Sequence, residues 1–129
     1  MLKKTITYTD YDGNERTEDF YFNFSEAELM DMQLETEGGF GEYIQKIVDA
    51  KDKPELVRLF RKMVVESYGE KSPDGRRFVK SPEIQKAFME TPAYSIIYME
   101  LATNDGAASD FINHVIPTVK EAGVVKSVN

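Results

Sequence analysis

The sequence predicts an α+β fold, mostly helical, in which an N-terminal β-hairpin packs on about six short helices. Apolar residues alternate with a period of two only in residues 2–9 and 16–24, which indicates two strands. Farther along, apolar residues recur every three or four positions, as they do in amphipathic helices. The 129 residues suit one domain, so we expect a globular domain over 1–117 and a flexible C-terminal tail over 118–129.

The predicted hairpin joins its two strands through the turn sequence DYDGNE. Ile6 can face Phe20 or Phe22 on the neighbouring strand only if paired residue numbers sum to an even value, which requires a loop of odd length. A loop of three or five residues with Gly13 or Asn14 in the left-handed region satisfies this condition. Because an isolated hairpin is marginal in water, we expect its Phe-bearing face to rest on helices.

Helix starts are marked by capping residues. Ser25 with Glu28 forms a capping box that opens the first helix, which stops near Gly38 and Gly39. An amphipathic repeat follows over 40–48. Asp52 opens the third helix, and Gly69 is expected to cap its end. Three later helices are expected to begin at Ser81-Pro82, Thr91-Pro92 and Asn104-Asp105, and Pro117 is expected to end the last one.

Residues 70–80 form the longest polar interruption, with a β-turn expected at Ser72-Pro73-Asp74-Gly75. This segment belongs to a basic region, 58–80, that carries seven bases and three acids. Residues 10–42 carry eleven acids and one base. The bland interpretation is that both regions are solvated faces. The alternative interpretation is head-to-tail contact between copies, in which the acidic segment 10–42 of one copy meets the basic loop, residues 70–80, of the next.

Chemical motifs are scarce. Cysteine is absent, and the net charge of −7 argues against nucleic-acid binding. Part of a calcium-loop pattern is present at Asp10, Asp12 and Asn14. The Gly and Glu that the pattern requires later in the loop are replaced by Glu15 and Tyr21, which favours a hairpin turn. His114 is the only histidine and has no neighbouring nucleophile. We expect no catalytic residues, no metal and no cofactor. No apolar run is long enough for a membrane span, and no secretory signal is evident, so we expect an intracellular protein.

Three stretches of the sequence are similar to those of a known protein family: EDFYFNFSEAEL at 18–29, YGEKSPDGRRFVKSPEI at 68–84 and AYSIIYMELATNDGAASDFINHVIP at 93–117. Together they resemble tail assembly chaperones of long-tailed bacteriophages of the siphophage type. The resemblance implies a non-enzymatic protein of the host cytoplasm that binds the tape measure protein until the tail tube polymerises. It also implies self-association and, often, a longer frameshifted product of the same gene.

Two functions remain open on these grounds. The first is the assembly chaperone; the second is a small structural or regulatory tail-module protein that binds one folded partner. Helix-in-groove binding would need apolar surface left over on the third and fifth helices. The residues expected to contact a partner are Tyr68 and Tyr98, as half-exposed aromatics, and Arg76, Arg77 and Phe78 of the basic loop.

Overall fold

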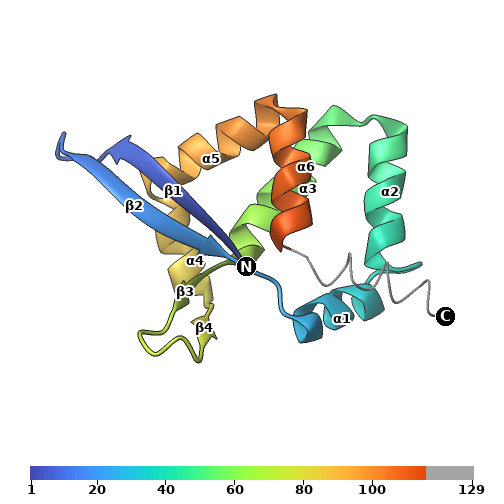
Figure 1. Cartoon of the computed structure of the whole chain (residues 1–129). Coiled ribbons are helices and arrows are strands. Elements are labelled where there is room, and N and C mark those ends of the chain that lie inside the picture. Colours follow the sequence, from blue (N-terminus) through green and yellow to red (C-terminus); the bar gives the residue numbers. More distant parts are fainter. Residues whose placement is uncertain (116–129) are drawn as a thin grey trace.

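A computed structural model describes residues 1–115 of the chain. Expectations that concern Pro117 and the segment 118–129 lie outside the described residues. The elements, in order, are β1 Leu2–Thr9, β2 Glu15–Phe22, α1 Glu26–Glu35, α2 Phe40–Ala50, α3 Lys53–Ser67, β3 Tyr68–Lys71, β4 Phe78–Val79, α4 Pro82–Met89, α5 Pro92–Thr103 and α6 Asp105–Val115 (Figure 1). The α+β, mostly helical fold with an N-terminal hairpin is therefore confirmed.

The N-terminal hairpin has the register parity that the sequence requires. β1 and β2 pair antiparallel from Leu2 opposite Phe22 to Thr9 opposite Glu15, so every pair sums to an even number. The loop between them has five residues, 10–14, and Gly13 occupies the left-handed region at φ 87°. Ile6 lies opposite Glu18, but it shares the core-facing side with Phe20 and Phe22.

Two further strands correct the expectation of a lone hairpin. β3 pairs with β2, placing Tyr68 opposite Phe22, and β4 pairs with β3, which completes a four-stranded antiparallel sheet in the order β1-β2-β3-β4. The expected turn over 72–75 connects β3 to β4, with the Gly75 amide donating to the Ser72 carbonyl at 2.9 Å. The two strands have four and two residues, too few for a period of two to be visible.

Gly69 does not cap α3, contrary to expectation. The helix ends at Ser67, and the Tyr68 amide donates to the carbonyls of Val64 and Val65. Gly69 lies in β3 directly against β4, where an added Cβ would sit 2.7 Å from the Phe78 ring and 2.8 Å from the Val79 carbonyl oxygen. The glycine therefore permits close strand contact.

The predicted helix starts are confirmed by their caps. At α1, the Ser25 hydroxyl accepts from the Glu28 amide while the Glu28 carboxylate accepts from the Ser25 amide. The side chains of Asp52, Ser81 and Thr91 cap α3, α4 and α5 by accepting from the backbone amide three residues on, without the reciprocal bond of a capping box. These local bonds satisfy helix donors that would otherwise lack partners.

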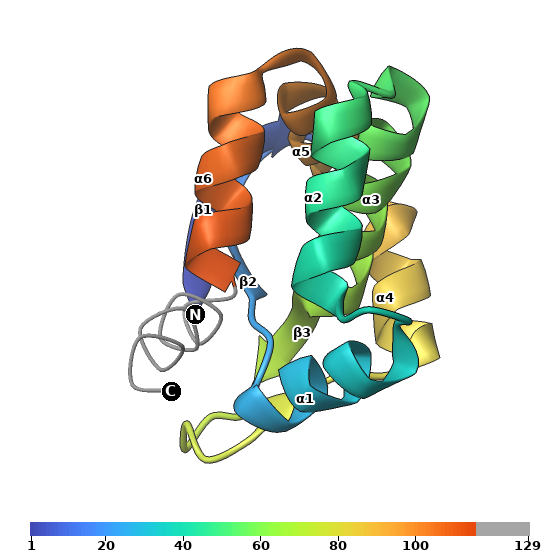
Figure 2. The same ribbon diagram turned by 90° about the vertical axis from the view of Figure 1, so that its right-hand side faces the viewer.

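An aromatic cluster joins the sheet to the helices. Phe22 is fully buried, with its ring centroid 5.7 Å from Tyr68, 5.7 Å from Phe88 and 5.4 Å from Phe111, each in an edge-on arrangement. In Figure 2, α2, α3 and α6 run roughly upright and α1 lies across below them. Within residues 1–115, no helix has the length and apolar composition that crossing a membrane requires.

Candidate partner-binding surface

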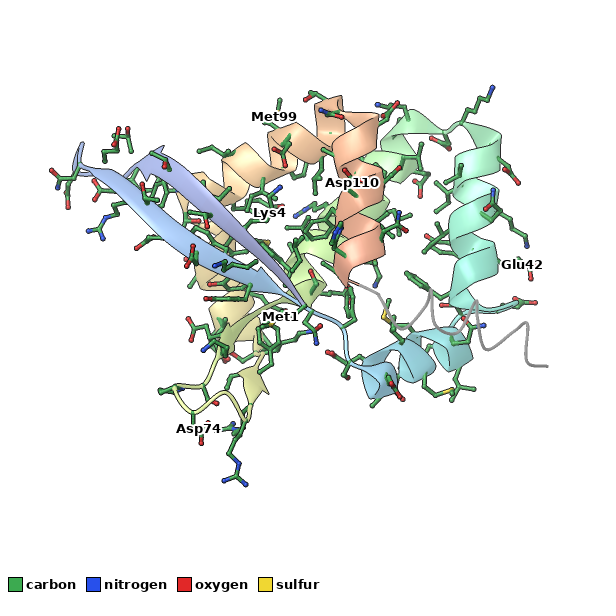
Figure 3. All side chains as sticks on the ribbon, viewed as in Figure 1. Met1, Lys4, Glu42, Asp74, Met99 and Asp110 are labelled. Carbon is green, nitrogen blue, oxygen red and sulfur yellow. The ribbon has the colours of Figure 1, made fainter. Side chains whose placement is uncertain are left out.

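Apolar side chains remain exposed on three helices after the core is filled. They lie on the outer faces of α1, α2 and α5, and they are Met30, Leu34, Tyr43, Val48, Ile96 and Met99. Figure 3 shows Met99 on the outer side of α5. The sequence prediction is right for the fifth helix. It is wrong for the third, because α3 exposes none of its large apolar side chains.

Helix α1 is the least embedded of these helices. It contains no buried residue, and only Leu29 and Met32 pack partly against the core. Its outward face carries Ala27, Met30 and Leu34, which are all exposed; we call these three residues the outer strip of α1. The helix is therefore held mainly through its ends.

Both ends of α1 are tied to the body by polar contacts. At the N-terminal end, the Lys80 ammonium lies 2.8 Å from a Glu28 carboxylate oxygen. The same ammonium lies 4.6 Å from the centre of the Phe24 ring and 5.9 Å from that of Phe78, within the range of cation–π attraction. Near the C-terminal end, the Gln33 side-chain oxygen accepts from the Phe40 amide at 2.8 Å, which joins α1 to the start of α2.

The Glu28–Lys80 pair also sets the charge state of this end of α1. Burial raises the pKa of Glu28, but the Lys80 ammonium and the Ser25 amide bond more than offset it, so the pKa lies below its ordinary value. Glu28 therefore stays ionised at neutral pH. The pair borders a groove of about 480 Å³ between α1 and α4, lined by Phe24, Glu28, Asp31, Met32, Glu66, Lys80, Ser81, Pro82 and Gln85.

The basic loop is exposed and internally braced. Arg76 and Arg77 are both exposed, and Figure 3 shows neighbouring Asp74 projecting away from the helices. The Asp74 carboxylate accepts from the Arg76 amide at 3.0 Å and from the Ser72 hydroxyl at 2.7 Å, and these bonds lower its pKa. The two guanidinium groups are thus presented on an ordered turn.

The aromatic residues proposed as partner contacts have different environments. Tyr68 is half-buried and stacks on Phe88, with ring centroids 4.0 Å apart and planes within 9° of parallel. Phe78 is half-buried against Gly69. Tyr98 is half-buried on α5, beside a gap of only about 10 Å³ between α3 and α5. The structure thus places Tyr68 and Phe78 in the same sheet as the basic loop and Tyr98 apart on α5.

The polar motifs considered for chemistry have ordinary structural partners. The Asp10 carboxylate accepts from the amides of Asp12 and Asn14, each at 2.9 Å, and pairs with Arg16, which lowers the Asp10 pKa. This is a turn, as expected. His114 is exposed, with Nδ1 2.6 Å from the Asp110 carbonyl oxygen. Among residues 1–115, no three His, Cys, Asp or Glu side chains are grouped as a metal site would require.

The sequence does not reveal that Leu34 and Ile96 are exposed, or that Lys80 forms an ion pair with α1. A weak signal existed for Leu34, because it lies seven residues after Ala27 and four after Met30. None existed for Lys80, whose partner Glu28 is 52 positions away in the chain.

Comparison with known proteins adds one result to this geometry. No curated protein and no solved structure matches the chain. A family model described as phage tail assembly chaperone matches residues 1–124, which is nearly the whole sequence. The chain therefore belongs to the phage tail assembly chaperone family.

Proposed function

We propose that this chain binds the tape measure protein of its phage and keeps it soluble in the host cytoplasm until the tail tube polymerises. Membership of the tail assembly chaperone family supports the proposal. The observation that carries it is the set of exposed apolar side chains on α1, α2 and α5, displayed by a chain of net charge −7.

This combination suits a protein that covers apolar helices without precipitating. Apolar side chains such as Met30, Leu34 and Met99 gain free energy when a partner removes them from water. Methionine is flexible and adapts to varied surfaces. The excess of acids keeps coated complexes apart through mutual repulsion. Binding of this kind needs no catalytic residue and no nucleotide.

Contact between copies forms part of the same proposal. Arg76 and Arg77 are exposed on the braced loop and take part in no ion pair within residues 1–115. The acidic segment 10–42 of a second copy supplies charge of the opposite sign. A longer frameshifted form that shares this domain would present the same loop.

Co-expression tests the proposal. The tape measure protein is produced with this chain, with an unrelated acidic protein of similar size, or alone, and its soluble fraction is measured. We expect a soluble fraction, and a complex that survives purification, only with this chain. Equal precipitation in all three cultures would contradict chaperone activity and leave the structural or regulatory alternative.

A further inference from the structure

The outer strip of α1 has the spacing of a helix-pairing seam. Ala27, Met30 and Leu34 follow one another at intervals of three and four, the spacing with which apolar residues face a second helix in a coiled coil. Met30 is 59% exposed and Leu34 is 76% exposed. Within residues 1–115, no neighbouring residue buries either side chain.

The contacts of α1 hold this strip outward. Leu29 and Met32 pack on the core from the other side of the helix, and Gln33 is bonded to the Phe40 amide. Rotation of α1 about its axis would expose Leu29 and Met32 and break the Gln33 bond. The strip is therefore presented to solvent by the same contacts that keep α1 in place.

The charges beside the strip define the partner. Glu26, Asp31, Glu35 and Glu37 are exposed around it, and residues 17–45 contain no Lys, Arg or His. The nearby cation Lys80 lies in the groove that Asp31 also lines, and it is already paired with Glu28. A helix with acidic flanks would be repelled here, whereas Lys or Arg beside an apolar stripe would pair with these carboxylates.

We propose that the outer strip of α1 docks an amphipathic helix of the partner whose apolar stripe is flanked by Lys or Arg. This inference rests on the proposed function, in that the tape measure protein would supply such helices. A strip of two helical turns binds one helix weakly, so firm attachment requires copies that also contact one another along a long partner and thus bind as a linked array. Weak binding by each strip therefore favours a coat of many copies along the partner over one tightly bound copy.

Two designed peptides test the chemistry independently of the tape measure protein. They share one helical apolar stripe, flanked in one peptide by Lys and in the other by Glu, and each carries a fluorescent label. Anisotropy measures their binding to the whole chain. We expect the Lys-flanked peptide to bind at least tenfold more tightly than the Glu-flanked one, and the difference to shrink as salt is raised.

Matched variants locate the binding. Met30→Gln/Leu34→Gln should weaken binding of the Lys-flanked peptide at least tenfold, whereas Ile96→Gln/Met99→Gln, which changes an exposed pair on α5, should not. Neither variant alters the charge. All four residues are exposed, so melting temperatures should stay near the wild-type value, which excludes unfolding as the cause.

The charge contribution is tested in the same way. Asp31→Asn/Glu35→Gln should weaken binding of the Lys-flanked peptide several-fold. Asp12→Asn/Glu15→Gln removes the same charge from the exposed end of the hairpin and should have little effect. Equal effects of the two variants would mean that only the net charge matters, which would overturn the assignment of a specific acidic flank.

The outcomes separate this inference from the proposed function. If the chain keeps the tape measure protein soluble but Met30→Gln/Leu34→Gln does so equally well and binds the peptide like wild type, the strip is not the docking site. If the strip binds the Lys-flanked peptide but the tape measure protein precipitates regardless, the inference holds and the proposed function fails. Self-association of wild type that the Met30→Gln/Leu34→Gln variant abolishes would assign the strip to a second copy and overturn the inference.

Discussion

Phe22→Ala is the substitution that most directly examines how the sheet is attached to the helices. The Phe22 ring is fully buried and meets the rings of Tyr68, Phe88 and Phe111, so it touches β3, α4 and α6 at once. Truncation removes these contacts and leaves a cavity that rigid neighbours cannot fill. Such a change lowers the free energy of unfolding by about 3–5 kcal/mol.

The expected shift in melting temperature follows from the size of the folded region. At about 2.1 cal/mol/K of unfolding entropy per residue, a domain of roughly this length loses about 4 °C per kcal/mol. Phe22→Ala should therefore melt about 12–20 °C below wild type, measured by far-UV circular dichroism. Tyr11→Ala, which truncates an aromatic ring that is 83% exposed on the hairpin loop, is the control and should melt like wild type.

Equal melting temperatures for Phe22→Ala and Tyr11→Ala would refute this reasoning. That result would mean that the hairpin does not share a cooperative core with α4 and α6. Independent melting of sheet and helices, seen as two transitions, would refute it as well.

Three further predictions concern the Glu28–Lys80 ion pair, the close contact between β3 and β4 at Gly69, and the basic loop. Glu28→Gln should lower the free energy of unfolding by about 1 kcal/mol at pH 7, measured by urea unfolding. Because the folded pKa of Glu28 lies below its ordinary 4.5, this difference from wild type should persist above pH 4.5 and vanish as the pH falls through the folded pKa. Gly69→Ala should destabilise the fold by about 1–3 kcal/mol because the added Cβ meets backbone, whereas Gly41→Ala, on an open face of α2, should stabilise it by about 0.5–1 kcal/mol. A Gly69→Ala variant that melts above Gly41→Ala would contradict the assigned strand contact. Arg76→Glu/Arg77→Glu should reduce self-association in sedimentation, and salt should do the same to wild type; identical assembly states under all conditions would exclude the loop from contact between copies.

The parts of the fold that depend on neighbouring residues were predictable from the sequence. Ser25 and Glu28 lie three positions apart and form the capping box within one turn, so their bond requires no knowledge of the rest of the chain. The parity of the hairpin register likewise follows from the alternation of Phe20 and Phe22 with polar residues, whereas the choice between a loop of three and one of five residues does not. In each case the signal and the contact lie in the same short segment.

The parts that depend on distant residues were not predictable. β3 and β4 are too short to show a period, and β3 is a strand because Phe22, far earlier in the chain, pairs with Tyr68. The apolar residues of α1 are distributed around the helix, so the sequence does not reveal that Leu29 faces the core while Leu34 faces water. The expectation for α3 was wrong for the same reason: its amphipathic pattern does not tell how completely its neighbours cover it.

The most direct test of the proposed chaperone activity is a titration. Denatured tape measure protein is diluted into buffer containing increasing amounts of this chain, and aggregation is followed by light scattering. A coating chaperone predicts that scattering falls steadily and reaches its minimum only at many copies of this chain per tape measure molecule. Scattering that is unaffected at any ratio, or that is abolished at one copy per molecule, would contradict coating of the tape measure protein by this chain.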